Sequence, residues 1–271
     1  MNPLAPARYP RHHGFTLVEL LIAMTIGMVL TLVVSLLFVG SRRTYATTDD
    51  ASRVQENIRY TYQLLNRMVH LAGYKSSPNS KTEEIFTAAN PVLQATDGGG
   101  TAPDSFTVSF QGNSNGTEAV ADGSIADCLG NPIAAGITAI NTFTIANHPT
   151  TGVPGLYCAV GASPTLPGVE IVPNVANMQI LYGVDNDSDL VADRYVVSGG
   201  IALENVRSIR FAFLFVSPTA SALLADNQKM DKSGGLTTRT YDLNGVTVGP
   251  FTDRFSRRTF TMTVSMRNRT P

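Results

Sequence analysis

GFTLVELLIAMTIGMVLTLVVSLLFVG occupies residues 14–40 of this 271-residue chain and is apolar almost throughout. About 20 apolar residues in a helix span the hydrocarbon core of a bilayer, so this stretch is long enough to cross a membrane. One residue, Glu19, places a carboxylate near the start of the run. An ionisable group inside such a segment is costly to bury, and it therefore predicts a function and a partner of opposite charge. We expect this partner to come from another subunit.

The residues before the apolar run indicate its orientation. They include four basic or titratable residues and no acid, namely Arg8, Arg11, His12 and His13. Basic residues ahead of an apolar segment stay in the cytoplasm, so the helix should place the rest of the chain outside it. An ordinary secretory signal would end in a small-residue cleavage site after the apolar run. Here a helical pattern continues instead, so we expect the segment to be retained.

After the basic leader comes the order Gly14-Phe15-Thr16-Leu17-Val18-Glu19, which resembles the signal of type IV prepilins and pseudopilins. In that family a membrane-embedded prepilin peptidase cuts after the glycine and methylates the new N-terminal residue. The resemblance implies that residues 1–14 form the leader, that Phe15 becomes the methylated N-terminus, and that Glu19 sets the register between subunits. The new amine at Phe15 would lie near Glu19 of an adjacent subunit, in an ion pair that selects geometry more than it adds stability. We expect the hydroxyls of Thr16 and Thr31 to bond back to their own helix.

Helical spacing continues beyond residue 40. An apolar stripe with i, i+3/i+4 spacing runs among polar residues, and no proline interrupts residues 15–75. The stripe consists of Val54, Ile58, Tyr62, Leu65, Met68, Val69 and Ala72. Gly73 is suited to end the helix in a left-handed conformation. The pattern predicts one helix, with a membrane or filament-core half at residues 15–40 and an amphipathic half at residues 41–73.

Two further stretches narrow the resemblance. SRVQEN at residues 52–57, followed by LAGY at residues 71–74, resembles PilW-type minor pilins of type IV pilus systems, and so does the ending RRTFTMTVSMRNR at residues 257–269. The resemblance covers both ends of the chain, and the middle is only loosely matched. It implies an α+β type IV pilin fold, in which the long N-terminal helix packs on an antiparallel β-sheet head at residues 74–271.

The head is expected to consist of strands and loops. Alternating, β-branched or aromatic stretches predict strands at residues 105–111, 142–146, 177–182, 194–197, 207–216 and 259–267. Loops are expected at residues 76–100, 150–167 and 225–235. In the stretch 207–216 both faces are apolar, which predicts burial by the helix on one side and by loops on the other. The last stretch alternates and should turn one side inward, with Phe260, Met262, Val264 and Met266.

Cys128 and Cys158 are the two cysteines of the chain, and both lie beyond the membrane segment. An even count in an exported domain indicates one disulfide. Its loop of about 30 residues would contribute about 3–4 kcal/mol in the chain-entropy model. The alternative is a pair of free buried thiols. Cys128 lies in an insert between the predicted strands 105–111 and 142–146, and Cys158 lies in the expected loop 150–167, so a bridge would join two inserts into one surface lobe.

The acidic stretch DNDSD at residues 185–189 lies between two predicted strands. Alternating carboxylates offer oxygen ligands to Ca²⁺, and the stretch begins like an EF-hand loop. Leu190 stands where that loop needs glycine and Val196 where it needs glutamate, so the stretch is not an EF-hand. Two alternatives remain, a metal-free hairpin connection or a calcium-bound turn formed by Asp185, Asp187, Asp189 and Asp193.

The remaining features argue against enzymes and nucleic-acid binders. The net charge is −1 at pH 7, so no basic surface for nucleic acid is expected. The four histidines, His12, His13, His70 and His148, form no catalytic motif with a serine or an aspartate. Two cysteines with so few histidines make no zinc site. We therefore expect no enzymatic activity, and no cofactor apart from the calcium considered above.

The resemblance to PilW-type minor pilins implies a structural function in pilus biogenesis. It implies insertion in the inner membrane of a Gram-negative bacterium, processing by the prepilin peptidase, and incorporation into a surface pilus near its tip. The implied partners are other minor pilins, the major pilin, a tip adhesin, the inner-membrane assembly platform and, before assembly, membrane lipid. Twitching motility and adhesion would follow. The alternatives are a J-type minor pseudopilin of type II secretion and a membrane-anchored binding protein that never polymerises.

Overall fold

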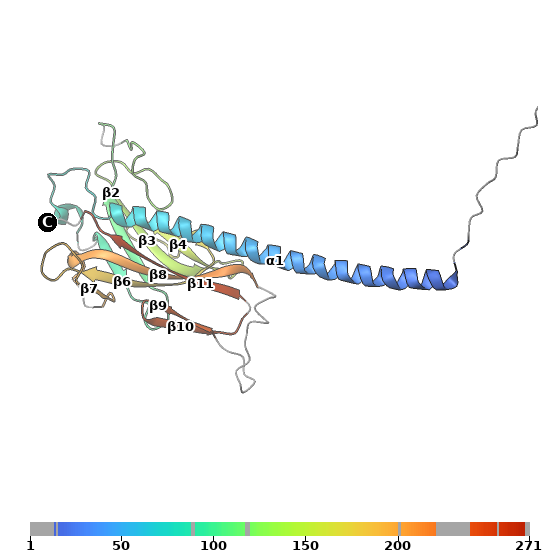
Figure 1. The fold of residues 1–271 in the computed structure, drawn as a ribbon. Coiled ribbons are helices and arrows are strands. Elements are labelled where there is room, and N and C mark those ends of the chain that lie inside the picture. Colours follow the sequence, from blue (N-terminus) through green and yellow to red (C-terminus); the bar gives the residue numbers. More distant parts are fainter. Residues whose placement is uncertain are drawn as a thin grey trace, which may run out of the picture. The chain divides into compact units, whose positions relative to one another are not determined.

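A computed structural model describes residues 14, 16–87, 90–116, 120–199, 202–220, 239–253 and 255–268. The described chain contains the long helix α1, the short helices α2 (Thr82–Ile85) and η1 (Leu203–Asn205), and eleven strands (Figure 1). It divides into two compact units, Met1–Thr48 and Asp49–Pro271. The leader up to residue 13, Phe15 and the loop predicted at residues 225–235 lie outside the described residues.

Helix α1 (Leu17–Leu71) runs without interruption for 55 residues, as its apolar periodicity predicts. In the second unit it turns one stripe into the core, made up of Val54, Thr61, Leu65, Met68 and Val69, and Ala72 directly after the helix is buried as well. The prediction for Tyr62 was wrong, because this residue is 45% exposed. The buried stripe passes from Ile58 through Thr61 to Leu65, in steps of three and four residues. Tyr62 follows Thr61 directly in sequence and therefore lies beside the buried stripe.

The end of α1 is fixed by Gly73, as predicted. Its φ of 79° lies in the left-handed region that glycine adopts without a steric penalty. A Cβ at this position would lie 2.9 Å from the carbonyl oxygen of Asn268, so a larger residue would also collide with the backbone near the C-terminus. The glycine therefore both terminates α1 and allows the last residues of the head to approach it.

The first sheet has five antiparallel strands in sequence order. They are β1 (Leu93–Thr96), β2 (Ser105–Gln111), β3 (Thr138–Asn147), β4 (Pro154–Val160) and β5 (Val169–Pro173). Strands β2 and β3 were predicted, whereas β1 and β4 occupy segments predicted to be loops. In β4, Gly155 and Ala159 weaken the strand signal, but pairing with β3 and β5 on its two sides satisfies the backbone regardless of propensity.

The second sheet contains the four strongest predicted strands, in the order β11-β8-β6-β7 (Figure 1). They are β6 (Val175–Val184), β7 (Arg194–Val196), β8 (Val206–Ala220) and β11 (Phe255–Ser265). All its pairings are antiparallel. In β11, Met262 and Val264 are buried while Thr261 and Thr263 are exposed, as the alternation predicts.

The two sheets and α1 share one hydrophobic core. Phe106 of β2 stacks on Phe143 of β3 with ring centroids 4.9 Å apart, and it also lies 5.0 Å from Phe211 of β8. Leu65 and Met68 of α1 belong to the same buried cluster. The α+β prediction of a long helix packed on antiparallel sheets is therefore confirmed, although the described strands form two larger sheets and a two-stranded one where a single sheet was expected.

The outer face of β8 is covered by a hairpin rather than by the predicted loops. The hairpin consists of β9 (Arg239–Leu243) and β10 (Val246–Phe251), and its Leu243 and Val248 pack on Ala212 and Leu214. Its turn residues Asn244 and Gly245 have φ of 55° and 91°, as a two-residue Asn-Gly turn requires. The Asn244 side chain donates to the carbonyl oxygens of Gln179 and Arg210, which fixes the hairpin on the sheet.

Candidate functional site

The first part of α1 has no buried residue. Every residue from 17 to 48 is exposed, although residues 17–39 include more than a dozen large apolar side chains. Within the described residues, α1 is the helix long and apolar enough to cross a membrane. In residues 17–39 the hydroxyls of Thr25, Thr31 and Ser35 donate to backbone carbonyl oxygens of their own helix; for example, Thr31 donates to the carbonyl oxygen of Gly27 at 3.0 Å, as predicted. Residues 17–39 therefore present an apolar surface whose hydroxyl groups are bonded within the helix.

Glu19 is the only acid in residues 14–48, and its side chain folds back to the start of α1. The backbone N–H of Thr16 donates to Glu19 Oε2 at 2.9 Å, and the Thr16 hydroxyl donates to the same oxygen at 3.0 Å. In return, the N–H of Glu19 donates to Thr16 Oγ1 at 3.2 Å. This reciprocal pair is a capping box, with Thr16 as the N-cap and Glu19 at the third helical position.

The predicted processing site lies just before this capping box. Gly14 is exposed, and a Cβ built on it would meet no atom within 4 Å. Phe15, the predicted methylated residue, lies outside the described residues. Cleavage and methylation therefore stay predictions.

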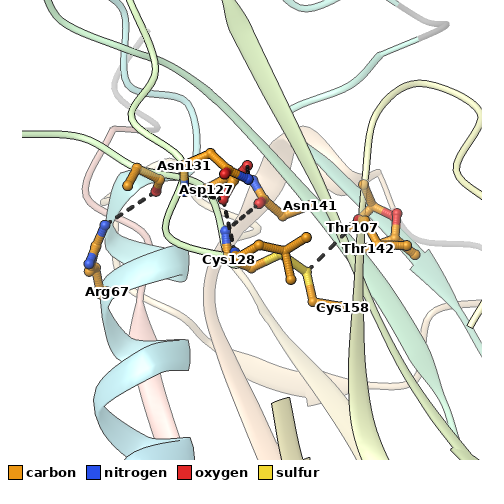
Figure 2. Close-up of a disulfide and its surroundings, with 11 residues drawn as sticks. Arg67, Thr107, Asp127, Cys128, Asn131, Asn141, Thr142 and Cys158 are labelled. Atoms are coloured by element: carbon orange, nitrogen blue, oxygen red, sulfur yellow. Dashed lines mark hydrogen bonds between the residues drawn. A yellow bond between two sulfur atoms is a disulfide. The ribbon is translucent and has the colours of Figure 1, made fainter. Parts of the chain in front are cut away.

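The structure joins Cys128 to Cys158, with Cα atoms 6.5 Å apart (Figure 2). The predicted position of the bridge was wrong in one respect, because Cys158 lies on strand β4 rather than in a loop. Both half-cystines are buried, and the N–H of Cys128 donates to the side-chain oxygen of Asn141 at 2.8 Å. The bridge therefore anchors the segment 112–137 to the first sheet instead of joining two surface loops.

A second contact ties the segment 112–137 to α1. Arg67 Nη2 donates to the carbonyl oxygen of Ala126 at 3.3 Å (Figure 2). Next to this contact, the carboxylate of Asp127 accepts hydrogen bonds from the N–H of Leu129 and from the N–H and side chain of Asn131. The turn that contains Cys128 is thus stabilised by the Asp127 carboxylate. Arg67 of α1 adds one hydrogen bond, at 3.3 Å.

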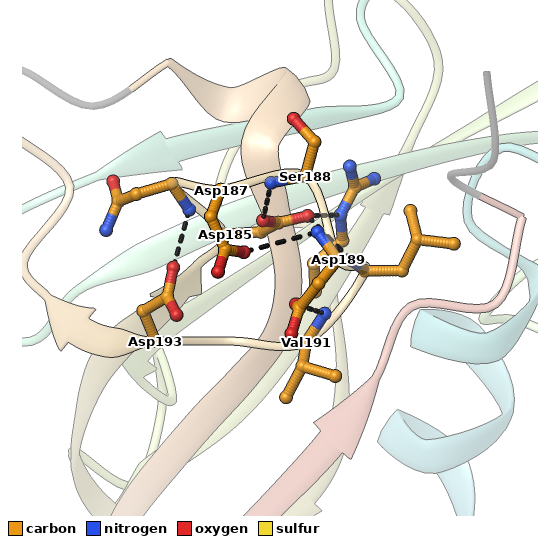
Figure 3. Close-up of polar contacts among 9 residues, drawn as sticks. Asp185, Asp187, Ser188, Asp189, Val191 and Asp193 are labelled. Carbon is orange, nitrogen blue, oxygen red and sulfur yellow. Dashed lines mark hydrogen bonds and ion pairs between the residues drawn. The ribbon is translucent and has the colours of Figure 1, made fainter.

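The acidic turn at residues 185–193 is organised around Asp185 (Figure 3). Its carboxylate accepts from the N–H of Ser188 at 2.7 Å, from the N–H of Leu190 at 3.1 Å and from Arg207 Nε at 2.9 Å. The hydrogen bond from Arg207 lowers the pKa of Asp185, and the backbone donors act in the same direction. Ser188 and Leu190 have φ of 66° and 70°, which is unfavourable for residues other than glycine. The buried carboxylate stabilises this strained backbone by accepting its N–H groups.

Three of the four predicted calcium ligands lie together. Carboxylate oxygens of Asp185, Asp187 and Asp193 lie within 4.8 Å of one another, whereas Asp189 accepts from the N–H of Val191 at 2.8 Å and is not part of this group. Calcium prefers six to eight oxygen ligands, and Asp185 is already paired with Arg207. Calcium binding therefore stays a prediction, and a rise in melting temperature with calcium that Asp187→Ala abolishes would test it.

Sequence reasoning missed three contacts of these sites. The Thr-x-x-Glu spacing of the capping box is visible in the sequence and would have paired Thr16 with Glu19. The ion pair of Arg53 with Asp49 at 2.9 Å, one helical turn earlier, was not predicted either. Asp185 and Arg207 lie on two segments that meet only in the folded sheet, so their pairing cannot be predicted from the local sequence.

Comparison with known proteins gives two family matches. The model of the prokaryotic N-terminal methylation motif matches residues 9–35, and that of type IV pilus-assembly protein W matches residues 142–268. Among solved structures, the type IV-like pilin TTHA1219 from Thermus thermophilus is similar with 12% identity and a TM-score of 0.47, over 80% of this chain and 99% of that chain. A comparison with curated protein sequences finds no significant match.

The methylation motif at the start of an exposed apolar helix places the chain in the class of type IV pilins and their relatives. Within that class, the match to type IV pilus-assembly protein W supports a PilW-type minor pilin of the type IV pilus. The match to residues 142–268 includes the middle of the chain, where the sequence motifs at the two ends gave only a loose resemblance. Membership of this class makes the protein a structural subunit.

Proposed function

We propose that the protein is cleaved after Gly14, methylated at Phe15 and built into the type IV pilus through the apolar part of α1. The observation that carries this proposal is the complete exposure of residues 17–39 in a chain whose second unit has an extensive core. An apolar surface of this length is unstable in water. It needs lipid before assembly, and we propose that the helices of neighbouring subunits replace this lipid in the filament.

The inner membrane is the proposed location before assembly, with the N-terminus in the cytoplasm and the head in the periplasm. The basic leader supports this orientation. The buried disulfide supports an oxidising compartment for the head, because disulfides persist outside the cytosol and are rare within it. The prepilin peptidase and the assembly platform are the proposed partners at this stage.

Glu19 is the proposed determinant of subunit register. It is the sole acid in an apolar segment, and it lies one helical turn from the proposed new N-terminus. A carboxylate in such surroundings is stabilised by a cation held at hydrogen-bonding distance. We propose that the amine at Phe15 of a neighbouring subunit supplies it.

The proposed place of the protein is near the pilus tip, in a priming complex with other minor pilins and a tip adhesin, on which the major pilin assembles. The match to type IV pilus-assembly protein W over residues 142–268 supports this place. Support of pilus biogenesis, twitching motility and adhesion would follow from it.

Mass spectrometry of the mature N-terminus, together with immunoblotting of sheared pili, tests the proposal. We expect the chain to begin with methylated Phe15 and to be present in sheared pili, whereas Gly14→Val should retain the leader and be absent from them. An intact leader on the functional protein would instead favour a membrane-anchored binding protein. Normal piliation with loss of exoprotein secretion in a deletion strain would favour a type II secretion pseudopilin.

A further inference from the structure

The capping box at the start of α1 uses only one oxygen of Glu19. Both hydrogen bonds that the described residues give to its carboxylate reach Oε2, and both come from Thr16. The Thr16 hydroxyl also accepts the N–H of Glu19, so one side chain both holds the carboxylate and caps the helix. A hydroxyl has one proton and two lone pairs, so it can make both contacts at once.

We propose that Thr16 is a positioning residue, which holds Glu19 at the start of α1 so that Oε1 stays available for the cation of a neighbouring subunit. The inference rests on the proposed function of Glu19 in subunit register and assigns to Thr16 a part in it. Because the capping contacts and the ion pair use different oxygens, the neighbour binds without breaking the capping box. The carboxylate is then already oriented before two subunits meet, which lowers the entropic cost of forming the pair.

The same contacts have a second consequence for the subunit before assembly. A carboxylate without hydrogen bonds is costly to place in apolar surroundings, and hydrogen-bond donors from its own chain reduce this cost. Thr16 supplies two such donors from the residue that directly precedes α1. The Glu19 carboxylate of the free subunit is therefore stabilised without a partner in another chain. The hydrogen bonds from Thr16 are kept when the subunit assembles.

Matched substitutions distinguish the effect of losing the Thr16 hydroxyl from the effect of losing the Glu19 charge and from the effect of losing any hydroxyl of the helix. Thr16→Val removes the hydroxyl and keeps the shape and the N–H, whereas Thr16→Ser keeps both capping contacts. Glu19→Gln keeps a side chain that completes a capping box but loses the charge. Thr31→Val removes a hydroxyl from the same helix, where that hydroxyl contacts only the carbonyl oxygens of Gly27 and Met28. It is therefore the control for the loss of a hydroxyl as such.

The first measurement is amide hydrogen exchange of the full processed chain in detergent micelles. We expect the Glu19 amide to exchange about fivefold faster in Thr16→Val than in wild type, the change that a typical lost N-cap hydrogen bond makes in an equilibrium. Thr16→Ser, Glu19→Gln and Thr31→Val should retain the wild-type rate at this amide. An unchanged rate in Thr16→Val would show that the capping contacts are absent and would overturn the proposal.

The second measurement is the amount of each variant in sheared pili, relative to the amount in the membrane. We expect Thr16→Val to be reduced about fivefold, in line with the same lost contact, while Thr16→Ser and Thr31→Val match wild type and Glu19→Gln is the lowest. Normal incorporation of Thr16→Val despite faster exchange would refute a positioning role. If wild type itself is missing from pili, the proposed function fails and Thr16 has no register to position, while the exchange data still report on the capping contacts.

Discussion

The two parts of α1 have the same secondary structure and opposite surroundings. From residue 17 to residue 48 every side chain is exposed, whereas from Val54 to Leu71 a stripe of the helix is buried in the core of the head. Leu32 is 61% exposed and Leu65 is 0% exposed, although the two residues belong to one helix. Helical periodicity therefore predicts the backbone of both parts, but only the pattern of polar residues predicts what covers them.

The difference also appears in the hydroxyl groups of the helix. Thr31 bonds to its own backbone on an exposed surface, and Thr61 bonds to the carbonyl oxygen of Asn57 at 2.8 Å while fully buried. In the second part the neighbours are residues of the same chain; for example, the Asn57 side chain donates to the carbonyl oxygen of Pro173. The first part has no buried residue among residues 17–48, and we propose that lipid or neighbouring subunits cover it. The stability of the head should therefore depend on the second part alone.

The largest expected effect separates the two parts directly. Leu65→Ala should lower the free energy of unfolding of the head by about 4 kcal/mol, because it leaves a cavity at a fully buried site. Leu32→Ala makes the same change at an exposed site and should alter it by less than about 0.5 kcal/mol. Denaturant unfolding of the full chain in micelles, followed by near-ultraviolet circular dichroism, measures both. Equal effects of the two substitutions would contradict the comparison.

Removal of the disulfide should destabilise the head and leave the exposed apolar part of α1 unaffected. Replacement of Cys128 and Cys158 by serine removes the cross-link over 30 residues of sequence separation. The chain-entropy model predicts a loss of about 3–4 kcal/mol from the head. Membrane retention of the apolar helix should stay at the wild-type level, as fractionation and immunoblotting would show. Release of the double variant from the membrane would contradict the independence of the first part.

Acid should weaken the head through Asp185. Its pKa is lowered in the folded protein, chiefly by the hydrogen bond from Arg207, so its contribution to stability is present above the unfolded pKa of about 3.9. This contribution is lost as the pH falls through the folded pKa, because the unfolded chain then binds the proton first. Unfolding curves between pH 6 and pH 3 should show a smaller loss of stability for Asp185→Asn than for wild type. Parallel curves would exclude this role.

The smallest expected effect lies at the boundary between the two parts. Arg53 pairs with Asp49 on the helix surface, and their side chains are 64% and 45% exposed. Arg53→Ala should change the free energy of unfolding by less than about 0.5 kcal/mol, because solvent screens such a pair. Addition of salt should have little effect on the difference between variant and wild type. A loss of several kcal/mol would mean that this turn of α1 belongs to the core.

The elements with strong local patterns were predicted from the sequence, and those held by distant pairing were not. Helix α1, its end at Gly73 and the four strands of the second sheet follow from periodicity and β-branched composition. Strand β4 was missed because its partners on both sides, rather than its own residues, make it a strand. The hairpin β9–β10 was missed although its Asn244-Gly245 turn is a strong local signal.

In the candidate sites, too, features with a local sequence pattern were predicted, and contacts between distant residues were not. Gly14 and Glu19 stand in a recognisable order along the chain, and the matched methylation motif includes both. The disulfide was predicted by cysteine count, but the burial of Cys158 required knowledge of β4. The contact of Asp185 with Arg207 joins residues 22 positions apart, and only the sheet brings them together.

The last residues of the head close onto the end of α1. Asn268 donates its side-chain amide to the carbonyl oxygen of His70, a contact that spans 198 residues of sequence. The ribosome therefore has to reach residue 268 before this contact can form, long after it has synthesised the N-terminal helix. A truncated product that stops before Phe255 would lack β11 and would leave part of the apolar stripe bare. Such a product should be degraded by proteases more readily than the complete head, so the stability of the head would depend on synthesis of its final strand.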